Sequence, residues 1–484
     1  MRYVSTRRTD GDGDGASFED VLLAGLARDG GLFVPESWPA PFSNGELEEM
    51  AALDYADLAV RLTRPFIGDA VAPEALERMA RECYAAFDHP AVAPLAQYGP
   101  GLWLMELFHG PTLSFKDYAL QFVGRLFDHV VARRGQRLTI LGATSGDTGS
   151  AAIEACRGRD SLSIIILHPE GRVSEVQRRQ MTSVDAPNVH NVAIQGTFDD
   201  CQVLVKAMFG DLPFRDSLNL AAVNSINWAR IMAQTVYYGY AALALGSPAR
   251  PVSFAVPTGN FGNVYSGYVA ARLGLPIRGF LIATNANDIL ARFFAGAGYR
   301  KSEVIASISP SMDIQVASNF ERLLFELHGQ DGGAVRALIE SLERSGGFTV
   351  AADILEQARG QFSARRVDDA RALDCMARAW RDGGKLIDPH SAAGLAAAED
   401  SIGDGAVDQG GEGHQTPMIC IATAHPAKFP DAVERATGIR PELPAALADL
   451  KRRAERVTQL PNDLAVVKEF VGAAAAGRYE GKVA

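Results

Sequence analysis

Three short segments of the chain combine residue types that can perform chemistry, and the first of them contains Lys116. This lysine follows the apolar and aromatic stretch FHGPTLSF at residues 108–115. A lysine whose ammonium group is partly desolvated loses its proton more readily and can act as a Schiff-base amine. A lysine can also extend from the rim of a buried helix toward water. Taken alone, Lys116 fits this second interpretation better.

The second segment, PTGNFGN at residues 257–263, lies between a strand-like run and a helix-like pattern. Gly259 and Gly262 let the backbone bend so that several N–H groups converge at the N-terminus of the helix. The helix dipole favours an anion such as phosphate at that position. A tight turn between strand and helix, with no ligand, explains the segment equally well.

The third segment, ATSGDTG at residues 143–149, has the same strand–loop–helix setting and several hydroxyl groups. It suits a carboxylate or a second phosphate, although Ser, Asp and Thr are also common N-cap residues. Its spacing resembles the nucleophile elbow of hydrolases, but Thr144 occupies the position where that elbow carries serine. Together, an amine, a phosphate-binding turn and an anion-binding loop indicate an enzyme that holds pyridoxal phosphate on a lysine. Nucleotide-binding glycine motifs are absent from the sequence.

The elements that must position these segments repeat one pattern, in which a short apolar run is followed by a polar loop and a helical stretch. This alternation predicts the α/β class, with parallel sheets covered by helices and ligands at the carboxyl ends of the strands. We expect four parts: a mostly helical N-terminal region over 1–95, a small α/β domain with the lysine over 96–245, a large α/β domain with the phosphate-binding turn over 246–430, and a helical C-terminal tail over 431–484.

Composition narrows the possible partners and the compartment. The 484 residues carry a formal charge of −11, which disfavours nucleic acids and anionic membranes as partners. No apolar run approaches the roughly 20 residues that a membrane span needs. The five cysteines are odd in number and lack a CxxC pair, so we expect a reducing, cytoplasmic location. The nine histidines show no zinc-binding spacing, and no metal site is expected.

The motifs of the chain resemble those of the threonine synthase family, whose members are pyridoxal-phosphate lyases with a fold related to the tryptophan synthase β-subunit. The resemblance extends over nearly the whole sequence. The matching segments include FHGPTLSFKD (108–117), TSGDTGSAA (144–152), NSINWAR (224–230), PTGNFGN (257–263) and TAHPAKF (423–429). The lysine segment and the TSGDTG and GNFGN loops, in this order and spacing, are the most specific of them.

The resemblance implies a role for each motif. Lys116 would carry pyridoxal phosphate as a Schiff base and shuttle protons, and Thr423 would hydrogen-bond the pyridine nitrogen. The residues that would hold the cofactor phosphate are Gly259, Asn260, Phe261, Gly262 and Asn263. Those that would hold the substrate carboxylate lie in the third segment: Thr144, Ser145, Asp147 and Thr148. Candidates for binding the leaving phosphate are Ser225 and Arg230, with Arg172 and Arg179 as alternatives. Because related enzymes have Asn in place of Asp147, the partner of the cofactor's ring hydroxyl stays open.

The implied reaction converts O-phospho-L-homoserine and water to L-threonine and phosphate by β,γ-elimination and replacement, the last step of threonine biosynthesis. One alternative is a threonine-synthase-like phospho-lyase that releases phosphate and 2-oxobutyrate. Another is a binding protein that keeps the fold without catalysis, but such a protein would be expected to lose its lysine, and Lys116 is present. The chain is expected to act as a monomer or a homodimer.

Overall fold

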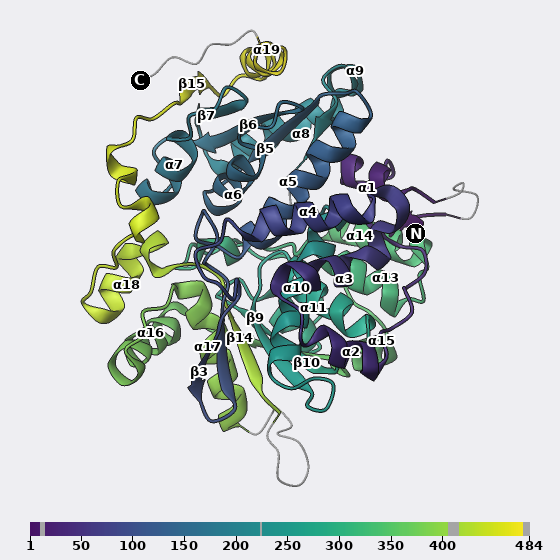
Figure 1. Cartoon of the computed structure of the whole chain (residues 1–484), viewed down its shortest axis with the longest axis vertical. Coiled ribbons are helices and arrows are strands. Elements are labelled where there is room, and N and C mark those ends of the chain that lie inside the picture. Colours follow the sequence, from purple (N-terminus) through teal and green to yellow (C-terminus); the bar gives the residue numbers. More distant parts are fainter. Residues whose placement is uncertain (10–14, 223–224, 405–415, 478–484) are drawn as a thin grey trace.

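Two sheets, both largely parallel, organise the chain, which confirms the predicted α/β class (Figure 1). The computed structural model describes residues 1–9, 15–222, 225–404 and 416–477. The larger sheet has six strands, in the order β13 (Phe362–Arg366), β10 (Ile277–Thr284), β9 (Val252–Pro257), β14 (Met418–Ala422), β4 (Leu102–Glu106) and β3 (Leu95–Gly99). Within it, only the pairing of β3 with β4 is antiparallel.

The smaller sheet has five strands, all paired in parallel. Their order is β15 (Thr458–Pro461), β7 (Val189–Gln195), β6 (Leu162–Pro169), β5 (Leu138–Ala143) and β8 (Leu220–Ala221). The central strand β6 is buried along its whole length. Its run of isoleucines fits a strand that is covered by helices on both faces.

Side chains alternate between two cores across the larger sheet. Phe254 and Val256 of β9 join the core that includes α10 (Trp228–Ala244) and α11 (Gly262–Arg272). Ala255, between them, faces α17 (Pro389–Gly403) and α16 (Asp369–Gly383) on the other side. The alternation follows from the two-residue period of a strand.

The smaller sheet shows the same arrangement. Ile140 and Ile164 pack toward α5 (Lys116–Arg133) and α6 (Asp147–Cys156). Leu141 and Ile165 pack toward α8 (Phe198–Gly210) and α19 (Leu464–Ala475). Figure 1 shows α5 and α6 beside β5 and β6, with α19 near the C-terminal end of the chain.

The N-terminal region is mostly helical, and it packs over α10. It holds α1 (Phe18–Ala24), α2 (Asn44–Met50), α3 (Tyr55–Ile67) and α4 (Pro73–Tyr84), with a two-stranded sheet of β1 (Tyr3–Ser5) and β2 (Phe33–Pro35). The remaining elements are α7 (Glu175–Thr182), α9 (Leu212–Ser217), α12 (Ile289–Phe294), α13 (Phe320–Leu327), α14 (Gly332–Ser345), α15 (Ala352–Arg359), α18 (Pro430–Thr437), β11 (Tyr299–Arg300), β12 (Gly347–Phe348) and the short helices η1 (Gly68–Ala70), η2 (Pro310–Met312), η3 (Pro426–Lys428), η4 (Ala445–Leu447) and η5 (Leu450–Arg452).

The predicted boundaries between the parts of the chain disagree with the observed sheets in two places. Strands β3 and β4 belong to the larger sheet, although they fall in the segment expected to form the small domain. The C-terminal segment, expected to be helical, contributes β15 to the edge of the smaller sheet before α19. This strand ends in a proline, and its residues alternate between half-buried and exposed with only one apolar side chain inside, so it lacks the apolar pattern that marks a strand in a sequence. Residues 478–484 of the tail lie outside the described residues.

Along the parts of the chain that the structure describes, no helix is both long enough and apolar enough to cross a bilayer.

Candidate active site

The lysine segment is fixed to the segment that follows β14. Lys116 is the first residue of α5, after the loop that leaves β4. The backbone N–H of Phe115 donates to the carbonyl of Thr423 at 2.8 Å, and that of His425 donates to the carbonyl of Leu113 at 3.0 Å. These bonds place Lys116 and Thr423 side by side, although the two are far apart in the sequence.

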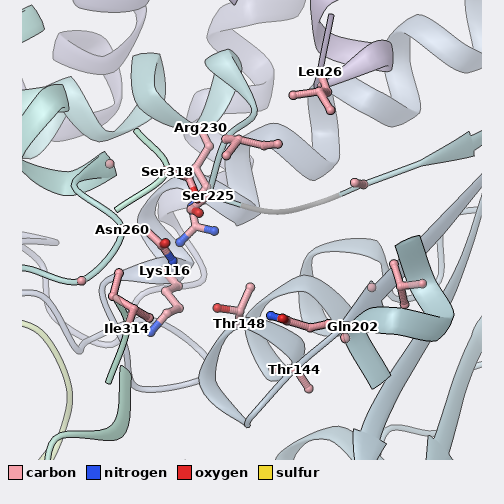
Figure 2. Close-up of a pocket in the computed structure, with 18 of the residues that line it drawn as sticks. Leu26, Lys116, Thr144, Thr148, Gln202, Ser225, Arg230, Asn260, Ile314 and Ser318 are labelled. Carbon is pink, nitrogen blue, oxygen red and sulfur yellow. The ribbon is translucent and has the colours of Figure 1, made fainter. Parts of the chain in front are cut away.

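A cavity of about 1890 Å³ lies where the carboxyl ends of β5 and β9 meet the start of α5. It is lined by all the residues predicted for the site except the two alternative candidates Arg172 and Arg179: Lys116, Thr144, Ser145, Asp147, Thr148, Ser225, Arg230, Gly259, Asn260, Phe261, Gly262, Asn263 and Thr423. Figure 2 shows the side chains of Lys116, Thr148, Asn260 and Arg230 around one common space. The structure therefore brings the separate motifs of the sequence together.

The Lys116 amine is buried, with 7% of the residue exposed. Burial lowers its pKa, and the charges of Arg230 and Lys428 add to this effect. The carboxylate of Asp147, whose Oδ2 lies 3.2 Å from Nζ, acts in the opposite direction. A lowered pKa leaves more of the amine unprotonated near neutral pH, which is the form that attacks a carbonyl carbon.

Asp147 lies between two lysines. Its Oδ1 is 2.9 Å from Nζ of Lys428 and accepts a hydrogen bond from Nε2 of Gln177 at 2.7 Å. Burial raises the pKa of this carboxyl, but Lys428 and Lys116 outweigh burial and, with Gln177, hold the pKa well below its usual range. In the sequence, Lys428 stands out only as part of the motif TAHPAKF, and the motif does not reveal the partner of this lysine.

The turn at residues 257–263 presents backbone groups to the cavity. Phe261 has a left-handed conformation (φ 62°) and precedes α11, whose first-turn N–H groups have no carbonyl partner within the helix. The ring of Phe261 packs on Phe320 and Phe362, and its backbone N–H donates to the carbonyl of Gly259 at 2.9 Å. The turn fits a phosphate group held by backbone N–H donors.

Gly259 is expected to tolerate no side chain. A Cβ at this position would lie 2.6 Å from the carbonyl oxygen of Ser311, which belongs to backbone. Gly259→Ala should therefore displace the turn, destabilise the protein by about 1–3 kcal/mol, and weaken the binding of pyridoxal phosphate. Thermal unfolding and a cofactor titration followed by absorbance would measure both effects.

Gly472→Ala is the matched control for this prediction. Gly472 lies in α19, and a Cβ there would meet nothing within 4 Å. The control should bind the cofactor as the wild type does. Equal cofactor affinity of Gly259→Ala and the control would contradict the role assigned to the turn.

Thr423 offers a buried hydroxyl without a partner. The residue is 6% exposed, and Oγ1 makes no hydrogen bond within the described part of the chain. Its backbone N–H donates to Oγ of Ser391 at 2.9 Å, and Ser391 is in turn bound by the buried carboxylate of Asp388. A buried hydroxyl that is held in place but unsatisfied fits a ligand atom that accepts or donates a hydrogen bond, such as a pyridine nitrogen.

Thr423→Val tests this assignment, because valine has nearly the same shape and no hydroxyl. Without the cofactor, the variant should be as stable as the wild type or slightly more stable, since an unsatisfied buried group has been removed. Its affinity for pyridoxal phosphate should fall about 3- to 10-fold, the equivalent of one hydrogen bond. A variant that is less stable without cofactor and unchanged in affinity would show that the hydroxyl is structural.

Arg230 is a buried cation that no counter-ion of the described residues balances. It is 4% exposed, and among the described residues no carboxylate lies within ion-pair distance and Nη1 has no hydrogen-bond partner. Burial lowers its pKa to about 10. Its guanidinium group extends toward the cavity near Ser225 and Ser318 in Figure 2. A charge buried at this cost fits a site whose anion arrives with the ligand.

The loop after β5 is shaped by its own hydroxyl groups. Oγ1 of Thr144 accepts hydrogen bonds from the backbone N–H groups of Gly146 at 3.0 Å and Gly149 at 2.9 Å. Ser145 is exposed at the rim, and the hydroxyl of Thr148 points into the cavity (Figure 2). The predicted loop thus lines the cavity, but Thr144 also caps the start of α6.

Arg172 and Arg179, the two alternative candidates for the leaving phosphate, lie away from the cavity. Arg172 is exposed. Arg179 pairs with Glu175 at 3.2 Å and with Glu455 at 3.5 Å. Neither lines the cavity. Of the four candidates, only Ser225 and Arg230 are in a position to contact a ligand there.

Three family models match the chain. The model described as threonine synthase N terminus matches residues 2–84. The model described as pyridoxal-phosphate dependent enzyme matches residues 88–412, and the model described as threonine synthase, C-terminal, matches residues 391–471.

Individual relatives are similar over their full length. The chain is 52% identical to the threonine synthase of Pseudomonas aeruginosa, over 97% of this chain and 98% of that protein. The crystal structure of PLP-bound threonine synthase from Brucella melitensis has a TM-score of 0.93 at 51% identity and covers 98% of this chain and 99% of that one. The crystal structure of threonine synthase from yeast has a TM-score of 0.91 at 38% identity, with 98% and 99% of the two chains covered.

Proposed function

Because the chain belongs to the threonine synthase family, we propose that it converts O-phospho-L-homoserine and water to L-threonine and phosphate. Membership of this family makes it a lyase that depends on pyridoxal phosphate. The observation that carries the proposed substrate is the guanidinium of Arg230, which has no counter-ion within the described part of the chain and shares one cavity with the Lys116 amine. A phosphorylated amino acid has a phosphate group for the guanidinium and a Cα proton for the amine.

The residues present fit the cofactor. The Lys116 amine would hold it covalently, the N–H groups at the start of α11 would bind its phosphate, and the Thr423 hydroxyl would face its ring nitrogen. When bound, pyridoxal phosphate withdraws electrons from the Cα atom of the amino acid attached to it. A hydroxyl group cannot keep the ring nitrogen protonated as a carboxylate would, so charged groups around the site must supply more of the stabilisation.

Each of several side chains then has its own role in the reaction of the substrate. The Lys116 amine, once released by the incoming substrate, takes the proton from Cα and later one from Cβ. Arg230 binds the phosphate as it leaves Cγ with the electron pair of the C–O bond. The two protons return to Cγ, which becomes the methyl group, and to Cα, while the hydroxyl group of water adds at Cβ and the remaining proton of water goes to the released phosphate. Asp147, in contact with the same amine, orients it toward the substrate carbon atoms. The hydroxyl groups of the loop after β5, which line the same cavity, would hold the substrate carboxylate.

Product analysis tests the proposed reaction. The holoenzyme would be incubated with O-phospho-L-homoserine, and the products would be identified by chromatography with a phosphate assay. We expect threonine and phosphate in equal amounts. Release of phosphate with 2-oxobutyrate alone would instead identify a phospho-lyase, and no phosphate release at all would contradict the proposed substrate.

We also propose a cytoplasmic location. The support is the state of the five cysteines, which are all buried and unpaired. Buried free thiols are typical of proteins kept in a reducing compartment.

A further inference from the structure

Lys428 is the least exposed lysine of the site, with 0% of its surface accessible. Its ammonium group lies 2.9 Å from Oδ1 of Asp147 and donates a hydrogen bond to the carbonyl of Thr112 at 2.6 Å. A buried ammonium group is costly unless a counter-charge and hydrogen bonds compensate it. Here both partners belong to the segments that carry the chemistry.

Further hydrogen bonds fix the partners of Lys428. The carboxylate of Asp117 accepts from Thr112, from its backbone N–H at 2.9 Å and from its Oγ1 at 2.6 Å. Gln177 holds the Asp147 oxygen that contacts Lys428. The other oxygen of Asp147, Oδ2, is the one that lies 3.2 Å from Nζ of Lys116. One carboxylate therefore links two lysines, and the surrounding contacts leave it little freedom to move.

We propose that Lys428 is a positioning residue for Lys116: its ammonium group balances the charge of Asp147, so that this carboxylate can orient the Lys116 amine without keeping it protonated. The inference rests on the proposed role of Lys116 as the lysine that carries the cofactor. It assigns no contact between Lys428 and the substrate.

The charges around Lys116 support this balance. Asp147 faces the amine from α6, Arg230 from α10 and Lys428 from η3, while Asp117 neighbours it on α5. Burial raises the pKa of Asp117 to about 6, and its oxygens are bound by Thr112. Without Lys428, no ammonium group would offset the negative charge of Asp147, and the pKa of the Lys116 amine would rise. A smaller fraction of the amine would then be unprotonated near neutral pH.

The pKa of the Lys116 amine can be measured without cofactor or substrate. The full-length apoprotein would be labelled with acetic anhydride across a pH series, and labelling of Lys116 would be quantified by mass spectrometry. We expect Lys428→Met to raise the amine pKa by at least about one unit and Asp147→Asn to lower it. The double variant Asp147→Asn/Lys428→Met should return close to the wild-type value, because it removes both charges.

A purely structural role would not produce this compensation. Lys468→Met is the control, because Lys468 pairs with Asp211 on the far side of the smaller sheet and should leave the Lys116 pKa unchanged. In the holoenzyme, the acidic limb of kcat against pH, which reports the amine after the substrate has released it, should move to higher pH in Lys428→Met. An unchanged amine pKa in Lys428→Met, or a double variant no closer to wild type than the single variants, would overturn the proposal.

The proposal can be tested even if one variant does not fold or if the proposed reaction is wrong. If Lys428→Met does not fold because Asp147 is left buried and unpaired, Asp147→Asn is compared with the double variant, and addition of Lys428→Met should raise the Lys116 pKa. The labelling measures the pKa of the Lys116 amine without any reaction of the substrate, so its result does not depend on whether the proposed reaction is correct. A preparation that forms no threonine but shows the expected pKa shifts would refute the reaction and leave the charge balance standing.

Discussion

Lys116→Ala is expected to reduce the rate of threonine formation by at least about 10³-fold. Two functions are lost together, because the same amine holds the cofactor and moves the protons at Cα and Cβ. The variant should still bind pyridoxal phosphate through the turn before α11, but without a covalent bond. Borohydride reduction followed by peptide mapping would show the labelled lysine in the wild type and no label in the variant.

Lys385→Ala is the control for this prediction. Lys385 is part-buried and pairs with Glu106 at 3.2 Å, outside the residues that line the cavity. It should retain the wild-type rate and the label on Lys116. Full activity in Lys116→Ala, or a reduced label on a different lysine, would refute the assignment of the catalytic amine.

The fold class could be predicted because the strand–loop–helix pattern is local. Strand β6 is a run of apolar residues between turns, and α6 follows β5 directly after a glycine-containing loop. Strand β15 could not be predicted in this way. Its pairing with β7 depends on where the chain lies after α18, and four residues, none of them fully buried, are too few to show a periodic signal.

The site could be predicted as far as its motifs are continuous. The turn before α11 and the loop before α6 each carry their glycine and hydroxyl residues within one short segment. The partner of Asp147 could not be found, because Lys428 comes from the segment after β14, and only the folded chain shows that the two meet. The absence of a partner is harder still to predict. Arg230 has no carboxylate within ion-pair distance among the residues that the structure describes, and this is a property of all its described neighbours in space.

Arg230→Met is expected to lower kcat/KM by between about 30-fold and a few thousand-fold, since truncating one member of a buried charge pair costs about 2–5 kcal/mol. The same change should make the apoprotein more stable. The pKa of Arg230 is lowered by burial to about 10, below the value of an unfolded chain, so the folded state binds the proton less tightly. The buried protonated guanidinium therefore destabilises the folded state at every pH below about 10. Its removal at neutral pH should raise the free energy of unfolding by on the order of 1–3 kcal/mol.

Arg322→Met is the matched control, because Arg322 is also fully buried and burial lowers its pKa to about 10 as well. Unlike Arg230, it donates hydrogen bonds to the carbonyls of Phe33 at 3.0 Å and Ile226 at 2.6 Å. Its replacement leaves buried carbonyls unsatisfied and should destabilise the protein. Opposite changes in melting temperature for the two variants would separate an arginine kept for a ligand from one kept for the fold.

Inorganic phosphate should raise the melting temperature of the wild-type holoenzyme and not that of Arg230→Met. An Arg230→Met variant that is less stable and still responds to phosphate would show that the substrate phosphate is bound elsewhere.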